Sequence, residues 1–236
     1  MQKMSEISIQ KAAQIAGVSI VLMTLAAVAA TDLTIGPLIV SGNATATEEN
    51  IRASAMTFRL GVLSWIIILV CDVFAAWGLY EFLKPVNKGL SLISAWLRLV
   101  YAAILGASML NLAHILVLIN NENYVSALGT QVLFFMDSFE SLWSLGLLVF
   151  GLHIFLVGYL TWKSGYVPKI LGIWLIIGFF GYMITHLSGL LLPQFSNFNK
   201  IMGWIFIIPM LGEVALGLWL IIKGRKIVLQ SKNTRT

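Results

Sequence analysis

Residues 60–83 read LGVLSWIIILVCDVFAAWGLYEFL, an apolar run long enough to cross about 30 Å of hydrocarbon as a single helix. This run decides the fold class, because comparable runs recur along the whole chain. We predict membrane-spanning helices at about 12–31, 60–83, 90–119, 132–161, 169–191 and 201–222. The sequence therefore predicts an all-α fold, a polytopic transmembrane bundle of six helices forming a single domain over residues 1–236.

Composition supports a membrane protein and excludes several other classes. Of the 236 residues, 59% are hydrophobic and 11% are charged, whereas about a quarter of a soluble domain is charged. A span takes roughly 20 residues plus a connection, so no room remains for a separate soluble catalytic domain. The net charge of +5 is spread over connections and a short tail, which disfavours nucleic-acid binding. The single cysteine, Cys71, excludes an intramolecular disulfide.

Lysine and arginine are concentrated in alternate connections, which predicts the orientation of the chain. Such residues mark the cytoplasmic side of a membrane protein, so we expect both termini to be cytoplasmic in a multi-pass protein of the cell membrane. A cleaved signal peptide is an alternative for the first span, because residues 27–29 resemble a small-residue cleavage site. The residues that set the orientation are Lys3, Lys11, Lys84, Lys88, Lys163, Lys169, Lys223, Arg225, Lys226, Lys232 and Arg235.

Two features lie on the predicted outer side. The third and fourth spans run to roughly 30 residues, longer than a perpendicular crossing needs, so we expect them to tilt or to project beyond the bilayer. The sizeable outer connection is 32–57. Within it, Thr47, Glu48 and Glu49 predict the N-cap and acidic first turn of a short amphipathic helix.

Ionisable residues inside the spans are the candidates for function, because each costs about 2.5–3.5 kcal/mol on insertion scales. Asp72, Arg98, His153 and Glu213 form a predicted deeper layer. Such a group could bind a polar ligand, with Arg98 holding an anionic group, or could relay protons through the carboxylates and His153. The alternative is that Arg98 neutralises a carboxylate and ties helices together.

A second predicted layer lies in the outer half of the spans, with Arg59 at its rim. Histidine and carboxylate side chains there are residue types that bind zinc, and Asp137 and Glu140 share a helix face. No H-E-x-x-H, H-x-x-x-H or E-x-x-H spacing supports a metal site, so we expect neither a metal nor a cofactor. The layer consists of Asn111, His114, Asp137, Glu140 and His186, of which the last four are the weak metal-ligand candidates.

Several short motifs together resemble a known family. They are FRLG at 58–61, CDV at 71–73, LKPVN at 83–87, RL at 98–99, GLH at 151–153, GYL at 158–160, SGYVPKILG at 164–172, GE at 212–213, WL at 219–220 and KG at 223–224. As a set, they resemble a family of bacterial integral membrane proteins catalogued only as a domain of unknown function. The resemblance covers nearly the whole chain and implies a bacterial inner-membrane protein without an assigned activity.

The resemblance also separates the two layers. It implies that His114 and His186 do not match the family pattern, and that Phe139 and Thr185 stand where polar His-like and Asp-like residues are expected. These departures weaken the outer metal site and favour the deeper layer together with Asp137. Residues that match the family in type are Arg59, Asp72, Arg98, Asn111, Asp137, His153 and Glu213.

Three functions remain open from the sequence. The first is a transport-like or ligand-binding membrane protein whose buried polar site binds a small polar or amphiphilic ligand or relays protons. Against a full secondary transporter stands the lack of paired, broken inverted repeats. The second is an intramembrane enzyme acting on a lipid or isoprenoid-like substrate, with or without a metal. The third is a structural or regulatory partner of another membrane protein. The expected partners are the lipid bilayer, a small polar or amphiphilic ligand and a second copy in a homo-oligomer.

Overall fold

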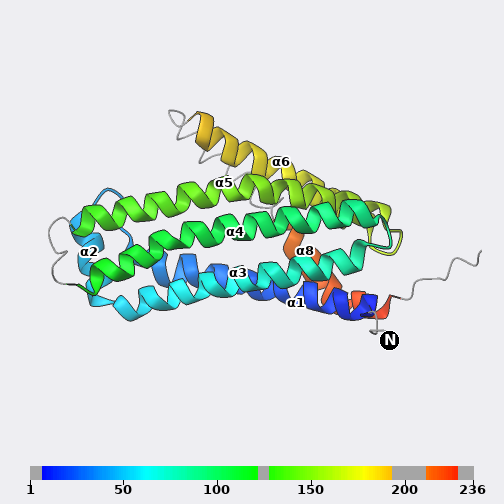
Figure 1. Cartoon of the computed structure of the whole chain (residues 1–236), viewed down its shortest axis with the longest axis horizontal. Coiled ribbons are helices and arrows are strands. Elements are labelled where there is room, and N and C mark those ends of the chain that lie inside the picture. Colours follow the sequence, from blue (N-terminus) through cyan, green and yellow to red (C-terminus); the bar gives the residue numbers. More distant parts are fainter. Residues whose placement is uncertain (1–6, 122–127, 193–210, 228–236) are drawn as a thin grey trace, which may run out of the picture.

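The fold is a bundle of long helices, seen in a computed structural model that describes residues 7–121, 128–192 and 211–227 (Figure 1). Every regular element within these residues is helical, which confirms the all-α class. The elements are α1 Ile9–Val28, the π-helical turn η1 Ala29–Ile35, the 3-10 turn η2 Gly36–Leu38, α2 Ala44–Ala53, α3 Ala55–Leu83, α4 Lys88–Ile119, α5 Leu128–Lys163, α6 Lys169–Leu191, α8 Gly212–Ile222 and the 3-10 turn η5 Gly224–Lys226.

Five helical segments within the described residues are long and apolar enough to cross a membrane. They match the first five predicted spans, and α6 has the bounds predicted for the fifth. Residues 201–210 of the predicted sixth span lie outside the described residues, and residues 212–222 form α8. The five segments are Ile9–Leu38, Ala55–Leu83, Lys88–Ile119, Leu128–Lys163 and Lys169–Leu191.

The outer connection differs from the prediction at both of its ends. The first helix continues through η1 and η2 to Leu38, and α3 begins at Ala55. The N-cap of α2 is Asn43, whose side chain accepts a hydrogen bond from the Ala46 N–H at 3.0 Å. The prediction of an N-cap at Thr47 is therefore wrong. Thr47 lies inside α2, fully buried, and its hydroxyl bonds back to the chain at Val40.

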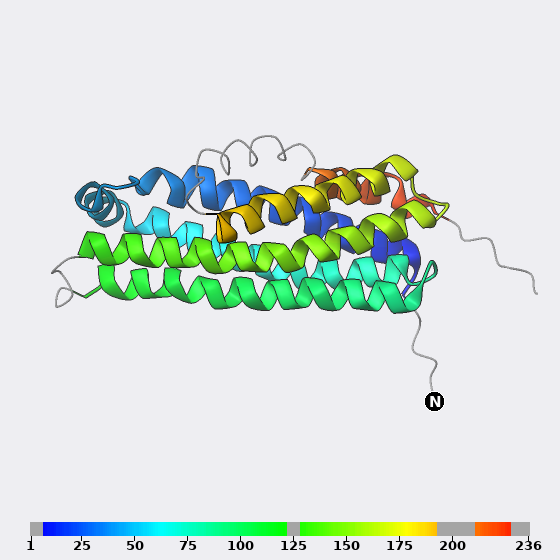
Figure 2. The same ribbon diagram turned by 90° about the horizontal axis from the view of Figure 1, so that it is seen from above.

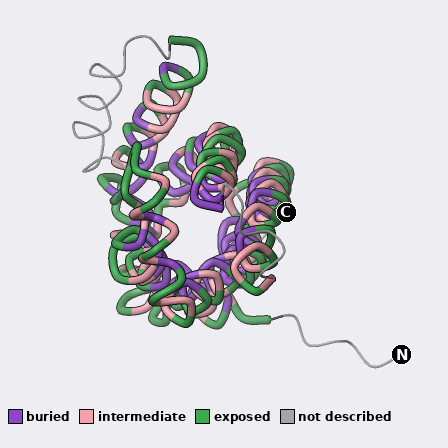
Figure 3. Tube along the Cα trace, turned by 90° about the vertical axis from the view of Figure 1, so that its left-hand side faces the viewer, coloured by how far each residue is buried: buried purple, intermediate pink, exposed green. Residues whose placement is uncertain are grey.

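The helices pack mainly against their neighbours in sequence, with α8 as the exception. α1 packs along α3 and along α8, α3 packs on α4, and α5 lies between α4 and α6. Figure 2 shows α4 and α5 running side by side, and Figure 1 shows α6 diverging from α5 toward Leu191. Viewed along the bundle, buried residues mostly turn inward and exposed ones outward (Figure 3).

Each long helix buries one stripe that advances by three or four residues, the spacing of a single helix face. In α3 the stripe includes Asp72, and in α4 it includes Arg98. The stripes therefore point these two ionisable residues into the bundle. The α3 stripe is Phe58, Gly61, Trp65, Ile68, Asp72, Ala75, Leu79 and Phe82, and the α4 stripe is Ser91, Ser94, Arg98, Tyr101, Leu105, Ser108, Leu112 and Ile115.

One end of the bundle carries the basic connections. The start of α1, the α3–α4 turn, the α5–α6 turn and η5 all lie there, opposite α2 (Figure 1). In the α5–α6 turn, Gly165 adopts a φ of +72°, a backbone conformation that disfavours other residues. This turn presents Tyr166, whose hydroxyl donates a hydrogen bond to the Phe82 carbonyl at 2.7 Å, and burial raises the pKa of Tyr166. The α5–α6 turn is thereby joined to the end of α3.

Candidate functional site

The four ionisable residues of the predicted deeper layer come from four helices but lie at one depth. Asp72 is on α3, Arg98 on α4, His153 on α5 and Glu213 on α8. Counted from the basic end of each helix at 1.5 Å per residue, they lie about 14–17 Å inside the bundle. The four residues lie at one depth when distances are counted from the basic end. Distances counted from the helix centres would not show this, because α4 and α5 extend further at the opposite end.

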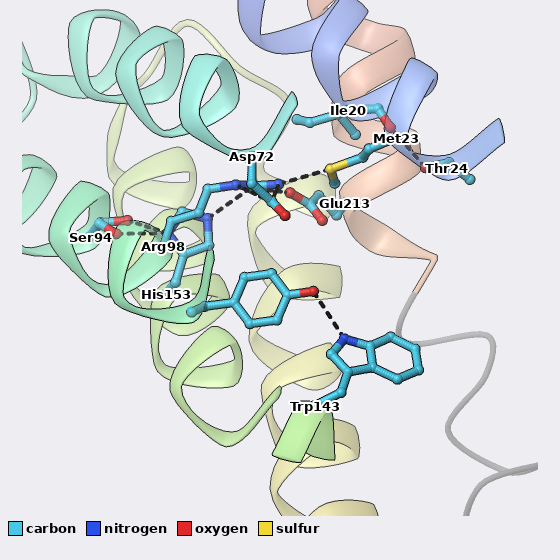
Figure 4. Close-up of polar contacts among 10 residues, drawn as sticks. Ile20, Met23, Thr24, Asp72, Ser94, Arg98, Trp143, His153 and Glu213 are labelled. Carbon is cyan, nitrogen blue, oxygen red and sulfur yellow. Dashed lines mark hydrogen bonds and ion pairs between the residues drawn. The ribbon is translucent and has the colours of Figure 1, made fainter. Parts of the chain in front are cut away.

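Arg98 is the hub of the site and is completely buried (Figure 4). Its Nε donates to Asp72 Oδ1 at 2.9 Å, and its Nη2 lies 2.8 Å from the same oxygen. Its Nη1 donates to Glu213 Oε1 and to His153 Nε2, the latter at 3.1 Å, and Nη2 also donates to the sulfur of Met23 at 3.1 Å. These five contacts match the five N–H donors of a guanidinium. Arg98 therefore has no free donor for the anionic ligand group expected from the sequence.

His153 is held in one tautomer by its two neighbours. Because Arg98 can only donate, His153 Nε2 must accept, which places the ring proton on Nδ1. Nδ1 lies 2.9 Å from the Ser94 carbonyl oxygen and 3.0 Å from the Ser94 hydroxyl. The ring thus donates to the backbone of α4 and accepts from Arg98 on the same helix. His153 therefore helps to fix the orientation of the Arg98 guanidinium.

A cavity of about 180 Å³ adjoins this network. Asp72 and Glu213 line it, together with residues of α1 and aromatic side chains, whereas Arg98 and His153 do not. Asp72 is 1% exposed, and its second oxygen, Oδ2, has no hydrogen-bond partner among the described residues. The cavity therefore meets the carboxylates of the network and not its guanidinium.

Two further cavities share walls with the first. One of about 240 Å³ shares Trp65 and Trp143 and extends along η1 toward the α2 end. Another of about 480 Å³, between α5 and α6, shares Trp143, Leu147 and Tyr182. Glu140 lines both neighbours. Trp143 thus stands where the three cavities meet, and its Nε1 donates to the Tyr101 hydroxyl at 3.2 Å (Figure 4).

The predicted outer layer comes together only in part, since Glu140 and His186 line one cavity between α5 and α6. His114 is exposed and its ring lies beside that of Phe135, with centroids 5.0 Å apart. The Nδ1 atom of His186 lies 2.9 Å from the hydroxyl oxygen of Ser144. Asp137 is exposed on α5. Within the described ranges, no three histidine, cysteine, aspartate or glutamate side chains are grouped as metal ligands would be. Of the predicted outer residues, the structure therefore brings Glu140 and His186 to one cavity, without a set of three metal ligands among the described residues.

The remaining predicted residues make separate local contacts. Asn111 donates from its side chain to the Ser108 carbonyl at 3.0 Å, one helical turn away. Arg59 is exposed and donates to the Asn120 side chain at 2.6 Å, which ties the start of α3 to the end of α4. Neither residue borders the cavity beside Arg98. Arg59 therefore joins two helices, whereas the Asn111 contact stays within α4.

Sequence reasoning missed several residues that complete the site. Ser94 and Tyr101 lie four residues before and three residues after Arg98, so the 3.6-residue period could have placed both on its face. Trp143 and Tyr182 carried no such signal, because aromatic residues are common throughout membrane helices. Met23 is one apolar residue among many in α1, and its contact with Arg98 depends on tertiary packing alone.

Comparisons with known proteins agree with the resemblance noted in the sequence. A family model described as "Domain of unknown function (DUF4386)" matches residues 15–224. A protein of Archaeoglobus fulgidus described as "Uncharacterized protein" is 34% identical over 161 residues, which cover 68% of this chain and 82% of that protein. No solved structure matches the chain. The matched region spans most of the chain and all four residues of the Arg98 network, and the chain belongs to the DUF4386 family.

Proposed function

We propose that this chain is a multi-pass membrane protein that binds a small polar or amphiphilic ligand at the interior site formed by Asp72, Arg98, His153 and Glu213. The observation that carries the proposal is the cavity of about 180 Å³ that borders both carboxylates, where Asp72 Oδ2 has no donor among the described residues. A buried acceptor without a partner costs about 1–3 kcal/mol. A ligand that supplies a donor there would remove this cost.

A purely structural role explains less of the site. Arg98 would then serve only to neutralise Asp72 and Glu213 and to join α3, α4 and α8. Interhelical polar contacts in membranes average only about 0.6 kcal/mol, a small return for burying three charged groups. That role also gives no reason for a cavity bordered by charge, since membrane bundles otherwise pack closely on small side chains. Ligand binding accounts for both features.

The test is to fill the cavity. Ala27 lines it from α1, so Ala27→Phe should occupy the space, whereas Ala113→Phe at an exposed position of α4 should not. Purified protein in detergent is titrated with benzylammonium, benzyl alcohol and benzoate, and thermal unfolding is followed. We expect at least one probe to stabilise the wild type and Ala113→Phe but not Ala27→Phe. If none of the three stabilises the wild type, or if Ala27→Phe responds equally, ligand binding at this site is refuted.

A proton relay is the second candidate, and the free oxygen of Asp72 favours it. Asp72 Oδ2 can take a proton from the cavity without breaking the contact of Oδ1 with Arg98. The neighbouring cavity along η1 is lined by a further carboxylate, Glu140. In liposomes loaded with a pH-sensitive dye, wild-type protein should speed the decay of an imposed pH gradient. Asp72→Asn should return the rate to that of empty liposomes, and the exposed control Asp137→Asn should not.

We also propose that the basic end of the bundle faces the cytoplasm in the cell membrane. The Lys and Arg residues of the two turns and of both described chain ends gather there, as the positive-inside rule requires of a cytoplasmic face. In a Cys71→Ser background, Lys88→Cys at this end and Ser41→Cys at the other provide exposed labelling sites. An impermeant thiol reagent added to whole cells should label Ser41→Cys alone. Labelling of Lys88→Cys alone would invert the orientation.

A further inference from the structure

The charge that the cavity presents is negative. Asp72 and Glu213 are its charged lining residues, and Arg98 lies behind them. One guanidinium faces two carboxylates, so a negative charge remains uncompensated when both are ionised. His153 does not supply the missing positive charge, because its Nε2 accepts from Arg98. An anion entering the cavity would meet carboxylate oxygens before any cationic group.

The rest of the wall is aromatic. The faces of aromatic rings carry negative electrostatic potential and attract ammonium and guanidinium groups, more strongly in sites shielded from water. The bundle already uses this interaction, because the Arg98 guanidinium carbon lies 5.3 Å from the centroid of the Phe150 ring. The aromatic lining residues are Trp65, Tyr101, Trp143, Phe150 and Tyr182, contributed by α3, α4, α5 and α6.

The adjoining cavities have the same polarity. Glu140 lines both, and no lysine or arginine is among the described residues that line the three cavities. Apart from Arg98, the described lysine and arginine side chains lie toward the two ends of the bundle, on or beside the start of α1, the α3–α4 and α5–α6 turns and η5, or on α2 and the start of α3. A cation in any of these cavities would therefore meet a carboxylate, and it would meet no lysine or arginine among the described lining residues.

We propose that the ligand of this site is a small organic cation, a protonated amine or quaternary ammonium group carrying an apolar substituent. This inference rests on the proposed ligand-binding function and names the chemical class. The ammonium group would lie near Asp72 Oδ2 and Glu213, and the apolar part against Trp65 and Trp143. A dry cavity of roughly 150 Å³ is known to hold benzene, so a single-ring amine suits a cavity of about 180 Å³.

The decisive comparison uses three probes of nearly one shape and three charges. Benzylammonium, benzyl alcohol and benzoate are titrated at pH 7 against purified wild-type protein in detergent, with dissociation constants from calorimetry. We expect benzylammonium to bind about tenfold or more tightly than benzyl alcohol, and benzoate to bind more weakly than both. Equal or tighter binding of benzyl alcohol or benzoate would overturn the cation proposal while leaving the ligand-binding function intact. Failure of all three would overturn both.

Variants then place the preference at the carboxylates. Asp72→Asn preserves the shape of the side chain and removes its charge, so it should reduce the ratio of benzylammonium to benzyl alcohol affinity to near one. Asp137→Asn, an equal change at an exposed position that lines none of the three cavities, should leave the ratio unchanged. A full preference retained in Asp72→Asn would overturn the assignment to this site. If Asp72→Asn folds poorly, the proposal can still be refuted, because the comparison of the three probes on wild-type protein needs no variant.

Discussion

Arg98 contacts Asp72 through one carboxylate oxygen only, with Nε at 2.9 Å and Nη2 at 2.8 Å from Oδ1. A bidentate arginine–carboxylate pair would engage both oxygens. Here the second oxygen remains without a donor among the described residues, in a side chain that borders a cavity. The guanidinium is turned so that it also reaches Glu213 and His153. Sharing one arginine among four acceptor residues, including Met23, thus leaves part of Asp72 available.

Removing Arg98 should destabilise the protein more than removing a surface arginine. Arg98→Met leaves two buried carboxylates uncompensated, and breaking a buried ion pair costs about 3–5 kcal/mol. Arg52 pairs with Glu48 one turn away on the exposed face of α2, at 3.0 Å, and such pairs contribute about 0.3–0.5 kcal/mol. Thermal unfolding of Arg98→Met and of the control Arg52→Gln in the same detergent measures the difference.

The same experiment has an internal check. Adding Asp72→Asn and Glu213→Gln to Arg98→Met removes the stranded charges, so the triple variant should recover part of the lost stability. Equal stability of Arg98→Met and wild type would show that the network contributes little to folding. A triple variant less stable than Arg98→Met would show that the loss came from packing instead of charge.

Ser94 and His153 should differ in their effects although they bond to each other. Ser94→Ala keeps the backbone carbonyl that receives the Nδ1–H of His153, so we expect a loss of at most about 1 kcal/mol. His153→Leu leaves one of the two Arg98 Nη1 hydrogens without an acceptor, which should cost about 1–3 kcal/mol, whereas the Ser94 carbonyl keeps its backbone bond within α4. Chemical unfolding of the two variants gives the ranking. A larger loss for Ser94→Ala would contradict the assignment of the tautomer.

Much of the fold and of the inner network was accessible from the sequence for a physical reason. An ionisable residue inside an apolar run stands out against its surroundings, so Asp72 and Arg98 could be selected without coordinates. Depth puts them in a common layer when it is counted from the basic end of each helix, because the rise of a helix is fixed, whereas depth counted from the span centres does not. The proposed ligand class could not be predicted from the sequence, because it depends on which acceptors occupy Arg98 and which atoms face the cavity.

The outer residues show what depth alone omits, which is rotation about the helix axis. In the part of α5 that carries Asp137 and Glu140, the buried positions are Val132, Met136 and Phe139, so both carboxylates lie one residue away from the buried stripe. His114 likewise lies between buried Leu112 and Ile115 on α4. In long spans that are apolar on all sides, the sequence does not show which face of the helix is buried. In α4 the polar residues Ser91, Ser94, Arg98 and Ser108 mark the buried face. Their spacing would have placed His114 outside that face.

Gly17 should be intolerant of a side chain because it carries the contact between α1 and α8. A Cβ added there would lie 2.7 Å from the Gly217 carbonyl oxygen and 2.8 Å from Cγ1 of Ile221. Forcing extra atoms into a packed core costs about 1–3 kcal/mol, so Gly17→Leu should lower the unfolding temperature. Gly189→Leu is the matched control on α6, since a Cβ there meets no described atom within 4 Å.

Gly17→Leu should also weaken benzylammonium binding, because α8 carries Glu213 and any shift of α8 away from α1 moves this carboxylate. Calorimetry on Gly17→Leu and Gly189→Leu tests the link between helix packing and the site. Unchanged binding in a destabilised Gly17→Leu variant would show that Glu213 keeps its place independently of the α1–α8 contact.

Metal removal should leave the protein unchanged. His114 and His186 lie on different helices, α4 and α6, and each is engaged locally, beside Phe135 and Ser144 respectively. A ligand present at 100 times its dissociation constant stabilises a folded protein by about 2.7 kcal/mol, so a genuine zinc site would be plain in thermal unfolding. We expect neither excess EDTA nor added zinc to shift the unfolding temperature. A zinc-dependent rise that disappears in both His114→Ala and His186→Ala would show that the two histidines converge after all.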